Sequence, residues 1–543
     1  MADQSTAVRA RKSHGSEVPP GLLLPDRQKA LILASVLLAL FLAALDATIV
    51  GVALPRIVAD LGGLDLFAWP ITAYLLASTV TVPVIGRLSD LYGRKPLLII
   101  GIVVFLAGSA MSGAAGSMES LIGFRAVQGF GAGLILANAF TILGDLFAPA
   151  DRARWMGLFA GVFALANVVG PLAGGFITDN ASWRWVFYIN LPIGAVALLA
   201  VSWQLPWFRQ RVRAKVDYLG GAILIAAGTS LLLGFSWAGN QFGWGETPVV
   251  ATFAVAAASI AAFVLVEARA GDDAVLPLRL FKNRVFLVII VVAATTGVAM
   301  FGVIQFMPLF LQGAQGVSAS NSGTVTMPLA LGLVAGSVLS GQLQNRLGMF
   351  RPLAIVGGLM MITGNFLLST LDGDSPANLT RGYMVLVGLG IGFAMPLFSV
   401  AIQNALPYRL LGVGTASNQF FRQIGATIGI ATFGSLLASQ FASKLAIAFP
   451  SGVDALRDNP QLLLDPDRLA RFHASVEARA PGTADGVVTT AREALGETVT
   501  DLFFIAAVVM IVAVVVMTLL PKIELRSRAE VLREAKSSEG GSS

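Results

Sequence analysis

The architecture of this chain follows from one short stretch, Gly86-Arg-Leu-Ser-Asp-Leu-Tyr-Gly-Arg-Lys-Pro96. A related stretch, Gly341-Gln-Leu-Gln-Asn-Arg-Leu-Gly348, has the same glycine spacing and carries Asn where the first has Asp. Each stretch ends an apolar run that is long enough to cross a membrane. Internal repeats of six spans are typical of transporters whose binding site lies between two halves near the membrane midplane. The repeat therefore predicts two equivalent six-helix halves.

The composition is that of an integral membrane protein. Of the 543 residues, 56% are hydrophobic and only 13% are charged, and the mean hydropathy is +0.77. Soluble domains carry about 25% charged residues. The chain has no Cys, and its only two His, His14 and His473, lie outside the apolar runs. This excludes disulfides, thiolate chemistry and a His metal site within the membrane, so we expect no metal site.

Fourteen apolar runs are candidates for membrane spans. A span needs roughly 20 apolar residues to cross about 30 Å of hydrocarbon. The runs cover residues 30–54, 67–87, 96–116, 119–144, 155–178, 183–205, 216–238, 247–267, 285–312, 321–345, 352–371, 380–405, 412–440 and 499–520.

The repeat divides these spans into a 6+2+6 arrangement. We expect an all-α integral membrane protein with two six-helix bundles and two additional transmembrane helices between them. The expected parts are a cytoplasmic N-terminal tail (1–29), an N-terminal bundle (30–205), an inserted helix pair with linkers (206–284), a C-terminal bundle (285–520) and a cytoplasmic C-terminal tail (521–543).

One segment between spans, residues 441–498, is long and polar. We expect an extracellular loop that is either solvated and caps the exit, or a lid that contacts substrate. The stretches Asp467–Glu477 and Val487–Gly496 are candidates for short amphipathic helices within it.

Lys and Arg gather in alternate loops. Arg94 and Lys95 lie in one such loop, Arg152 and Arg154 in the next and Arg209–Lys215 in a third, whereas the alternate short loops hold almost none, with Arg56 the main exception. The positive-inside rule assigns the basic loops and both termini to the cytoplasm. We expect a multi-pass protein of the cell (inner or plasma) membrane. The net charge of +6 serves this orientation, so we expect no nucleic-acid partner.

Two opposite charges lie at membrane depth. Asp46 interrupts the apolar run Phe41–Pro55, where a carboxylate costs roughly 2.5–3.5 kcal/mol. Asp46 lies about 12 Å, and Arg125 about 9 Å, from the outer ends of their spans. We expect the two to pair. Burial disfavours the ionised carboxylate and a nearby Arg favours it, which suits reversible proton binding. After protonation Arg125 needs another acceptor, such as Gln128, Asn138 or a carbonyl. The alternative is a static structural ion pair.

The stretch Gly86–Pro96 strongly resembles the cytoplasmic loop signature of the major facilitator superfamily. Gly86 and Gly93 permit a tight turn and close backbone contact. Asp90 can cap a helix N-terminus in the other half, and Arg94 can pair with Asp145 at the inner end of the fourth span. Together these contacts can hold the inner face closed.

A second motif, Gly170-Pro171-Leu-Ala-Gly174-Gly175, resembles the antiporter signature of the same superfamily. Gly157 occupies its early glycine position, but Ala166 stands where a further Gly is usual. Small residues allow tight helix packing and Pro171 allows a bend. The association with export is an implication of the resemblance, because the packing alone does not fix a direction.

Further stretches are similar to the fourteen-span drug:proton antiporter branch, the QacA/EmrB type. They are Leu45–Pro55 (with Gly51 for the usual Asn), Leu121–Gly131 with its buried-arginine motif, Ser182–Gly194 and Gly412–Gly425. The resemblance implies a major facilitator fold and export of small amphipathic molecules in exchange for protons. It further implies a membrane-embedded monomer that is driven by the proton gradient and needs no cofactor.

Polar and aromatic residues of the spans are candidates for the substrate pocket, since amphipathic substrates suit a cavity of mixed aromatic and amide character. For each Phe taken alone, helix packing or lipid contact is the commoner role. Arg422 can bind carbonyls, pair with an acid elsewhere or receive an anionic group, and the sequence does not choose. The candidates are Tyr74, Asn138, Asn167, Gln305, Phe306, Gln403, Asn404, Asn418, Phe421 and Arg422.

Two other functions remain as alternatives. One is export of a specific physiological lipid or metabolite. The other is a membrane-embedded enzyme or receptor. The sequence offers no metal-ligand cluster, nucleophile triad or phosphate-binding loop for an enzyme, and its Gly-rich runs lie inside spans. We therefore expect no catalytic residues.

Overall fold

The protein is seen in a computed structural model. Most of the chain is described, namely residues 24–61, 69–147, 149–207, 217–238, 242–271, 274–317, 319–347, 349–406, 410–449 and 466–521, with single positions at 21, 66, 456 and 463.

Helices make up nearly all of the described chain, and no strand occurs in it apart from one isolated bridge between Ala238 and Phe242. The helices are α2 (Asp26–Leu61), α3 (Trp69–Tyr92), α4 (Arg94–Gly113), α5 (Met118–Leu146), α6 (Pro149–Asn180), α7 (Trp185–Tyr188), α8 (Asn190–Gln204), α9 (Tyr218–Trp237), α10 (Thr247–Ala270), η3 (Leu278–Lys282), α11 (Arg284–Leu309), η4 (Phe310–Ala314), α12 (Ala319–Leu347), α13 (Phe350–Leu368), α14 (Ala377–Ala405), α15 (Leu411–Ala448), α17 (Pro466–Arg479) and α18 (Ala484–Met517).

The expectation of an all-α membrane protein is confirmed. Within the described residues, 13 helical segments are long and apolar enough to cross a membrane. The remaining predicted span, 155–178, falls inside α6, a single helix of 32 residues. The chain is therefore a multi-pass membrane protein.

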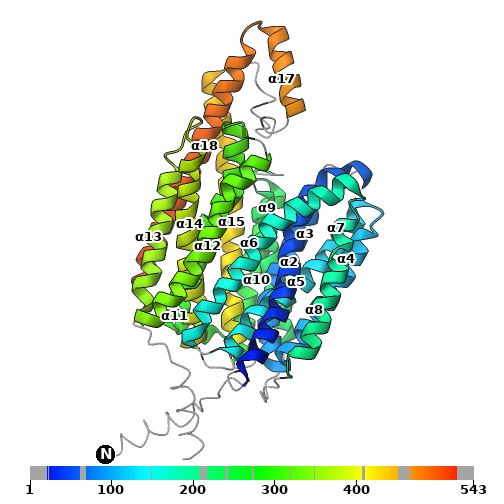
Figure 1. Ribbon diagram of the computed structural model, residues 1–543, viewed down its shortest axis with the longest axis vertical. Coiled ribbons are helices and arrows are strands. Elements are labelled where there is room, and N and C mark those ends of the chain that lie inside the picture. Colours follow the sequence, from blue (N-terminus) through cyan, green and yellow to red (C-terminus); the bar gives the residue numbers. More distant parts are fainter. Residues whose placement is uncertain are drawn as a thin grey trace, which may run out of the picture.

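The helices form two bundles beside each other (Figure 1). Helices α2 to α8 surround one set of apolar cores, and α11 to α18 share another large core. One end of the molecule, called here the basic end, holds Arg94, Arg152, Arg284 and Arg346 at helix termini. The opposite end carries α17 and is called the α17 end.

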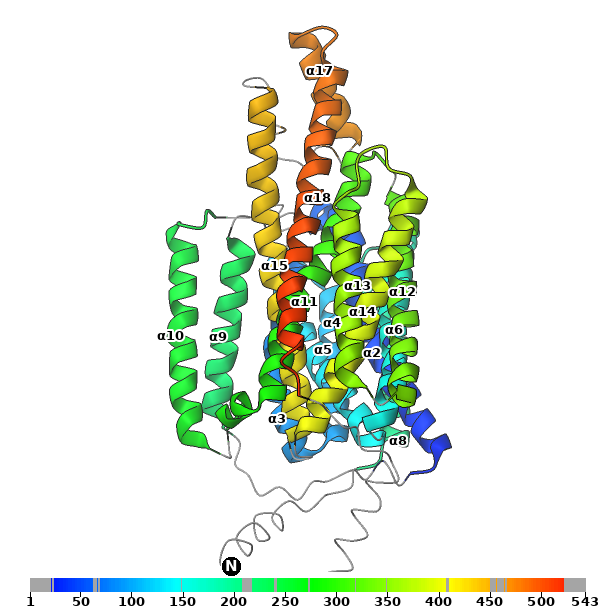
Figure 2. The same cartoon turned by 90° about the vertical axis from the view of Figure 1, so that its left-hand side faces the viewer.

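The inserted pair, α9 and α10, stands at one side of the bundles (Figure 2). Helix α9 follows α3 along most of its length. A Cβ placed on Gly228 would lie 2.9 Å from Val80, and one on Gly221 would lie 3.5 Å from Val84. At the α17 end, Trp237 of α9 meets Trp69 of α3 edge to face, with ring centroids 6.3 Å apart. The pair is thus attached to the N-terminal bundle through α3.

The segment 441–498 differs in part from the expectation. The predicted helix Asp467–Glu477 lies within α17. Val487–Gly496 is not a separate short helix, because α18 begins at Ala484 and continues without a break into the last span. The apolar face of this first part of α18, including Val487, Ala491 and Leu495, is buried in the C-terminal core, which explains why the helix does not end. Helices α15 and α18 project with α17 beyond the other helices (Figure 2).

Candidate functional site

Asp46 lies in the middle of α2 and is fully buried. Three side chains donate to its carboxylate. Arg125 Nη1 lies 2.5 Å from Oδ2, while Gln128 Nε2 and Asn190 Nδ2 each lie 2.8 Å from Oδ1. A buried carboxylate is tolerated when it is paired and hydrogen-bonded in this way. These residues, together with Tyr74, are called the charge cluster below.

Arg125 connects the charge cluster to α3. Its Nη1 also donates to Gln128 Oε1 at 2.8 Å, and its Nε donates to the Pro70 carbonyl at 3.2 Å. The guanidinium lies 4.2 Å from the centre of the Tyr74 ring, a cation–π contact. The Ser117–Ser120 capping box begins α5 and so fixes where Arg125 lies along it. Arg125 therefore contacts α2 and the first turn of α3 at once.

The prediction of acceptors for Arg125 is partly correct. Gln128 and a carbonyl, that of Pro70, already accept from it. Asn138 does not, because it lies further along α5, where it accepts from Ser89 Oγ at 2.6 Å and donates to the Leu134 carbonyl.

Asn190 belongs to the charge cluster although no property of the residue alone pointed to it. It begins α8 and is fully buried, and its Nδ2 also donates to Ser109 Oγ at 3.0 Å. The preceding turn is anchored to the end of α2, where Trp183 and Arg184 both donate to Asp60 Oδ2 at 2.9 Å. These bonds hold the pKa of Asp60 below its usual value. The signal in the sequence was the motif Ser182–Gly194, whose anchor positions Asn190.

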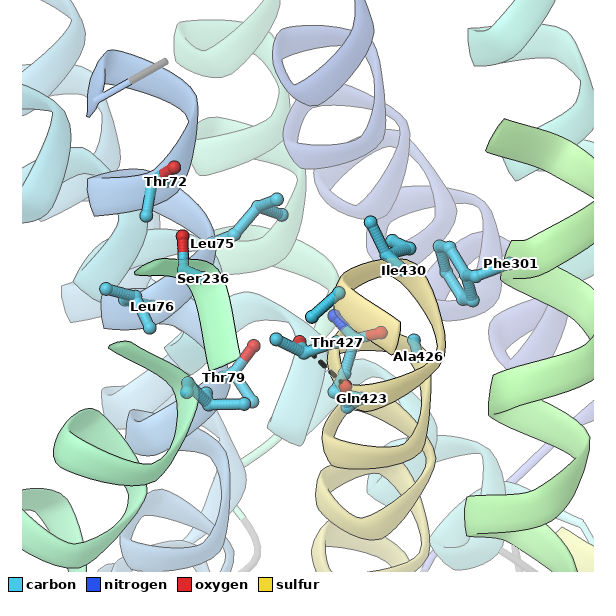
Figure 3. A pocket seen from close by; sticks show the side chains of 12 residues that line it. Thr72, Leu75, Leu76, Thr79, Ser236, Phe301, Gln423, Ala426, Thr427 and Ile430 are labelled. Atoms are coloured by element: carbon cyan, nitrogen blue, oxygen red, sulfur yellow. Dashed lines mark hydrogen bonds between the residues drawn. The ribbon is translucent and has the colours of Figure 1, made fainter. Parts of the chain in front are cut away.

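A pocket lies between α3, α9, α11 and α15 (Figure 3). It has an empty volume of about 760 Å³, including its open mouth. The lining is uncharged and mixes apolar side chains with hydroxyls and one amide, which suits an amphipathic molecule. The lining residues are Thr72, Leu75, Leu76, Thr79, Leu232, Ser236, Phe301, Gln423, Ala426, Thr427, Ile430 and Ala431.

Helix α3 separates the pocket from the charge cluster. Leu75 and Thr79 of α3 line the pocket. Pro70 and Tyr74 of the same helix contact Arg125 instead, and the Tyr74 hydroxyl donates to the Ala43 carbonyl of α2 at 2.9 Å. One helix thus carries the pocket on one face and the charge cluster on another. Asp46 itself is closed off from the pocket in this conformation.

The basic end is held together by a second group of charges. Asp90 accepts from the backbone N–H groups of Gly412 and Val413, both at 3.1 Å, at the start of α15 in the other bundle. Arg94 pairs with Asp90 at 2.6 Å and with Asp145 at 3.0 Å. The contacts expected for Asp90 and Arg94 are therefore present. A carboxylate at a helix N-terminus is favourable because of the helix dipole.

Gly86 and Gly412 complete this group, which is called the latch. A Cβ on Gly86 would lie 2.5 Å from Ala416 Cβ and 2.8 Å from the Gly412 carbonyl. Only glycine permits this approach of α3 to α15. Gly93 has a φ of +92°, a left-handed value that glycine adopts without strain, and it makes the sharp turn into α4.

The second glycine motif packs α6 against α2. A Cβ on Gly170 would lie 2.0 Å from Thr48 Oγ1, and one on Gly174 would lie 2.8 Å from the Ile49 carbonyl. Gly175 makes no such close approach, since its nearest neighbour, Val52, is 3.9 Å away. Helix α6 continues through position 171, but the side chains of Pro171 and Asn167 lie outside the described residues.

Of the predicted pocket residues whose side chains the structure describes, none lies among those that line the pocket. Tyr74 belongs to the charge cluster, and Asn138 lies beside the latch. Phe306 is buried against Phe433, with ring centroids 6.2 Å apart, and Gln305 is exposed. The candidates included residues of α3, α11 and α15, which line the pocket, but none of α9, and the residue types did not show which side of each helix faces the pocket.

The remaining candidates lie on α14 and α15. Gln403 donates to Thr415 at 3.2 Å and Asn418 donates to Ser399 at 3.4 Å, so both are used between these helices. Phe421 packs against Phe281 and Phe420. Asn404 is partly buried near the basic end of α14 and has a partner. Arg422, next to the pocket residue Gln423, remains the one candidate with an unexplained charge.

The sequence is similar to those of known transporters. Residues 36–430 match the sequence profile of the Major Facilitator Superfamily. The multidrug transporter protein MdtP of Bacillus subtilis is 40% identical over 429 residues, covering 79% of this chain and 79% of MdtP. Multidrug resistance protein 3 of the same organism is 34% identical over 506 residues, covering 93% of this chain and 97% of that protein.

Two solved structures share the fold. The human organic anion transporter MFSD10 gives a TM-score of 0.57 at 15% identity, covering 90% of this chain and 100% of that chain. The proton:xylose symporter XylE gives a TM-score of 0.58 at 12% identity, covering 94% of this chain and 99% of that chain.

Proposed function

The chain belongs to the major facilitator superfamily and is a transporter rather than an enzyme, and we propose that it exports amphipathic small molecules in exchange for protons by alternating access. Asp46 carries the proton in this proposal, and the pocket takes the substrate. The basic end faces the cytoplasm of the cell, by the positive-inside rule, and both termini lie there. The multidrug names of its relatives support the class of cargo.

The observation that carries the proposal is the bond from Arg125 Nε to the Pro70 carbonyl. Through it, the guanidinium that neutralises Asp46 also holds the first turn of α3. The next turns of the same helix line the pocket through Thr72, Leu75 and Thr79. A change in the charge of Asp46 is therefore communicated to the pocket by a path of two direct contacts.

Protonation of Asp46 removes the charge that holds Arg125. The guanidinium then keeps Gln128 Oε1 and the Pro70 carbonyl as acceptors. It therefore stays hydrogen-bonded, but its attraction to α2 is weakened while its bond to α3 remains. Since Asp46 is fully buried here, proton exchange requires a second conformation in which water reaches it. If the transporter binds either the proton at Asp46 or the substrate in the pocket, but not both at once, it exchanges one for the other.

The latch supports alternating access. In this structure it joins α3 to α15 at the basic end, while the pocket lies on the α17 side of it. Opening the latch breaks two hydrogen bonds from backbone N–H groups to the Asp90 carboxylate. Such charge-assisted bonds contribute about 1.5–3 kcal/mol each at most, so the step is reversible at ambient temperature.

The test is substrate uptake into proteoliposomes with an imposed pH gradient. Asp46→Asn is compared with the wild type and with Asp26→Asn, a matched control that removes an exposed carboxylate of the same helix outside the predicted span. We expect wild type and Asp26→Asn to respond to the gradient and Asp46→Asn to lose the response. Transport that ignores both the gradient and Asp46→Asn would reject proton exchange at this site.

A further inference from the structure

Arg422 is a cation on α15, roughly 15 Å from the start of the helix, without a carboxylate beside it. Its Nη1 donates to the Met395 sulfur at 3.4 Å and its Nη2 donates to Gln419 Oε1, while its Nε is buried without a partner. No salt bridge to it occurs among the described residues. By contrast, Arg125 and Arg94 are each paired with an aspartate.

The acids of the C-terminal bundle lie away from Arg422. Between Arg284 and Ala448 the sequence contains only two carboxylates, Asp372 and Asp374, and both lie in an exposed loop between α13 and α14. On α18, Glu497 and Asp501 pair with Lys444 near the far end of α15. Of the three roles open to Arg422, pairing with an acid of this bundle and binding a backbone carbonyl are therefore not observed in the described structure.

Arg422 adjoins the pocket along α15 without being one of its lining residues, and its guanidinium contacts Met395 of α14. It precedes the pocket residue Gln423, and Ala426, which also lines the pocket, lies one helical turn further along the same side of α15. Arg422 as a whole residue is partly exposed, whereas its Nε is buried. The pocket itself contains no acidic or basic side chain.

We propose that Arg422 binds the anionic group of the substrate, so that the preferred cargo is an amphipathic organic anion. This inference rests on the proposed function for the role of the pocket. The apolar part of the molecule lies against Leu75, Phe301 and Ile430, and its carboxylate or a similar oxyanion pairs with the guanidinium. Arg suits this role because its planar group matches oxyanions in two-point contact. A pocket without a carboxylate gives an organic cation no counter-charge.

The free-energy cost of an unpaired charge within the membrane supports this assignment. An unpaired Arg within a membrane helix is unfavourable, and such residues face a cavity or a partner. A substrate anion supplies the partner only when it is bound. The charge then acts as a specificity element of the pocket.

The experiment measures binding without any gradient, so that it is independent of proton coupling. The purified protein in nanodiscs of neutral lipid is titrated calorimetrically with 4-hexylbenzoate, its methyl ester and 4-hexylbenzylamine. These probes share one apolar body and differ in charge. Empty nanodiscs provide the blank.

We expect wild type to bind the benzoate at least about 10-fold more tightly than the ester, as one charge-assisted bond allows. Arg422→Gln should reduce this ratio to near one, and Arg422→Lys should keep part of it. Arg381→Gln, which removes a cation at the exposed start of α14, should leave the ratio unchanged. An equal affinity for all three probes in wild type, or a preference that survives Arg422→Gln, overturns the inference.

If Arg422→Gln fails to fold, Arg422→Lys and the wild type still test the inference. Arg422→Lys keeps the charge, and a wild-type protein that shows no preference for the benzoate already contradicts the proposal. If Asp46→Asn transports normally in proteoliposomes while the benzoate preference depends on Arg422, proton exchange is wrong and the anion site stands. The reverse pattern retains the exchange mechanism and removes the anion site.

Discussion

At the scale of single residues, Asn190 has a feature that the ionised state of Asp46 does not use. Its Nδ2 donates to Asp46, but its Oδ1 is buried without a partner in the described structure. A protonated carboxyl carries a new O–H that needs an acceptor. Rotation of the Asn190 amide presents Oδ1 to Asp46 in place of Nδ2. Asn190 can therefore satisfy Asp46 in both protonation states.

This role of Asn190 can be measured. Asn190→Ala removes the donor to the ionised carboxylate and the acceptor for the protonated one. Hydrogen bonds to charged groups contribute about 1.5–3 kcal/mol, so we expect gradient-driven uptake to fall by roughly 10-fold or more. Asn180→Ala is the control, because that exposed amide donates only to its own helix. Unchanged dependence of uptake on the imposed gradient in Asn190→Ala would contradict the role.

At the scale of elements, α3 connects the three functional regions. Its first turn accepts from Arg125, its middle lines the pocket, and its last turns hold Gly86 and Asp90 of the latch. A movement of this one helix relative to α15 changes the pocket and the latch together. The tightest approach of the two helices is at Gly86.

Gly86→Ala tests the latch. The added methyl group overlaps Ala416 and the Gly412 carbonyl, and overpacking of this kind costs about 1–3 kcal/mol. We expect the closed basic end to be destabilised, and a single Cys at Ser417, which is buried on α15, to be alkylated roughly 5-fold faster or more. Gly123→Ala is the matched control, because a Cβ there meets nothing within 4 Å. Equal alkylation rates in both variants would show that the contact does not hold the basic end closed.

The inserted pair has a testable part in the pocket, since Leu232 and Ser236 of α9 line it. Ser236→Trp fills space that a substrate needs, so we expect bulky substrates to lose transport while the smallest retain it. Ala257→Trp on the exposed side of α10 is the control. The measurement is the KM for a series of substrates of increasing size. If both variants behave as wild type, α9 supports the bundle and takes no part in binding.

At the scale of the whole molecule, the two halves meet at a second place on the basic side. A Cβ on Gly157 of α6 would lie 3.1 Å from Val338 Cγ2 of α12. The pair Gly157→Cys and Val338→Cys is therefore close to the Cβ separation of about 3.5–4.5 Å that a disulfide requires. We expect oxidation to block transport and reduction to restore it, with each single variant active. Full transport by the oxidised double variant would exclude rocking of the halves about this contact.

The sequence predicted contacts whose chemistry is local to a motif. Asp90 at a helix N-terminus, Arg94 beside Asp145, and Asp46 level with Arg125 all followed from residue type and depth along a helix. The residues that line the pocket could not be predicted in this way, because they depend on how each helix is rotated about its own axis. Tyr74 was expected there, whereas its neighbour Leu75 lines the pocket. Asn190 was missed because a neutral amide at the start of a span, unlike a buried charge, does not require a partner of opposite charge.

The projection at the α17 end has a practical consequence. Helix α15 has 38 residues and α18 has 34, so at 1.5 Å per residue each is roughly 50–57 Å long, well beyond the ~30 Å of hydrocarbon. Both belong to the C-terminal bundle, and α17 packs on α18. When that bundle tilts, α17 moves further than the helices near the membrane midplane, because it lies furthest from them. Because the chain has no Cys, a single Cys introduced on α17 can be labelled with a spectroscopic probe without background. The movement of that probe then reports the tilt of the C-terminal bundle.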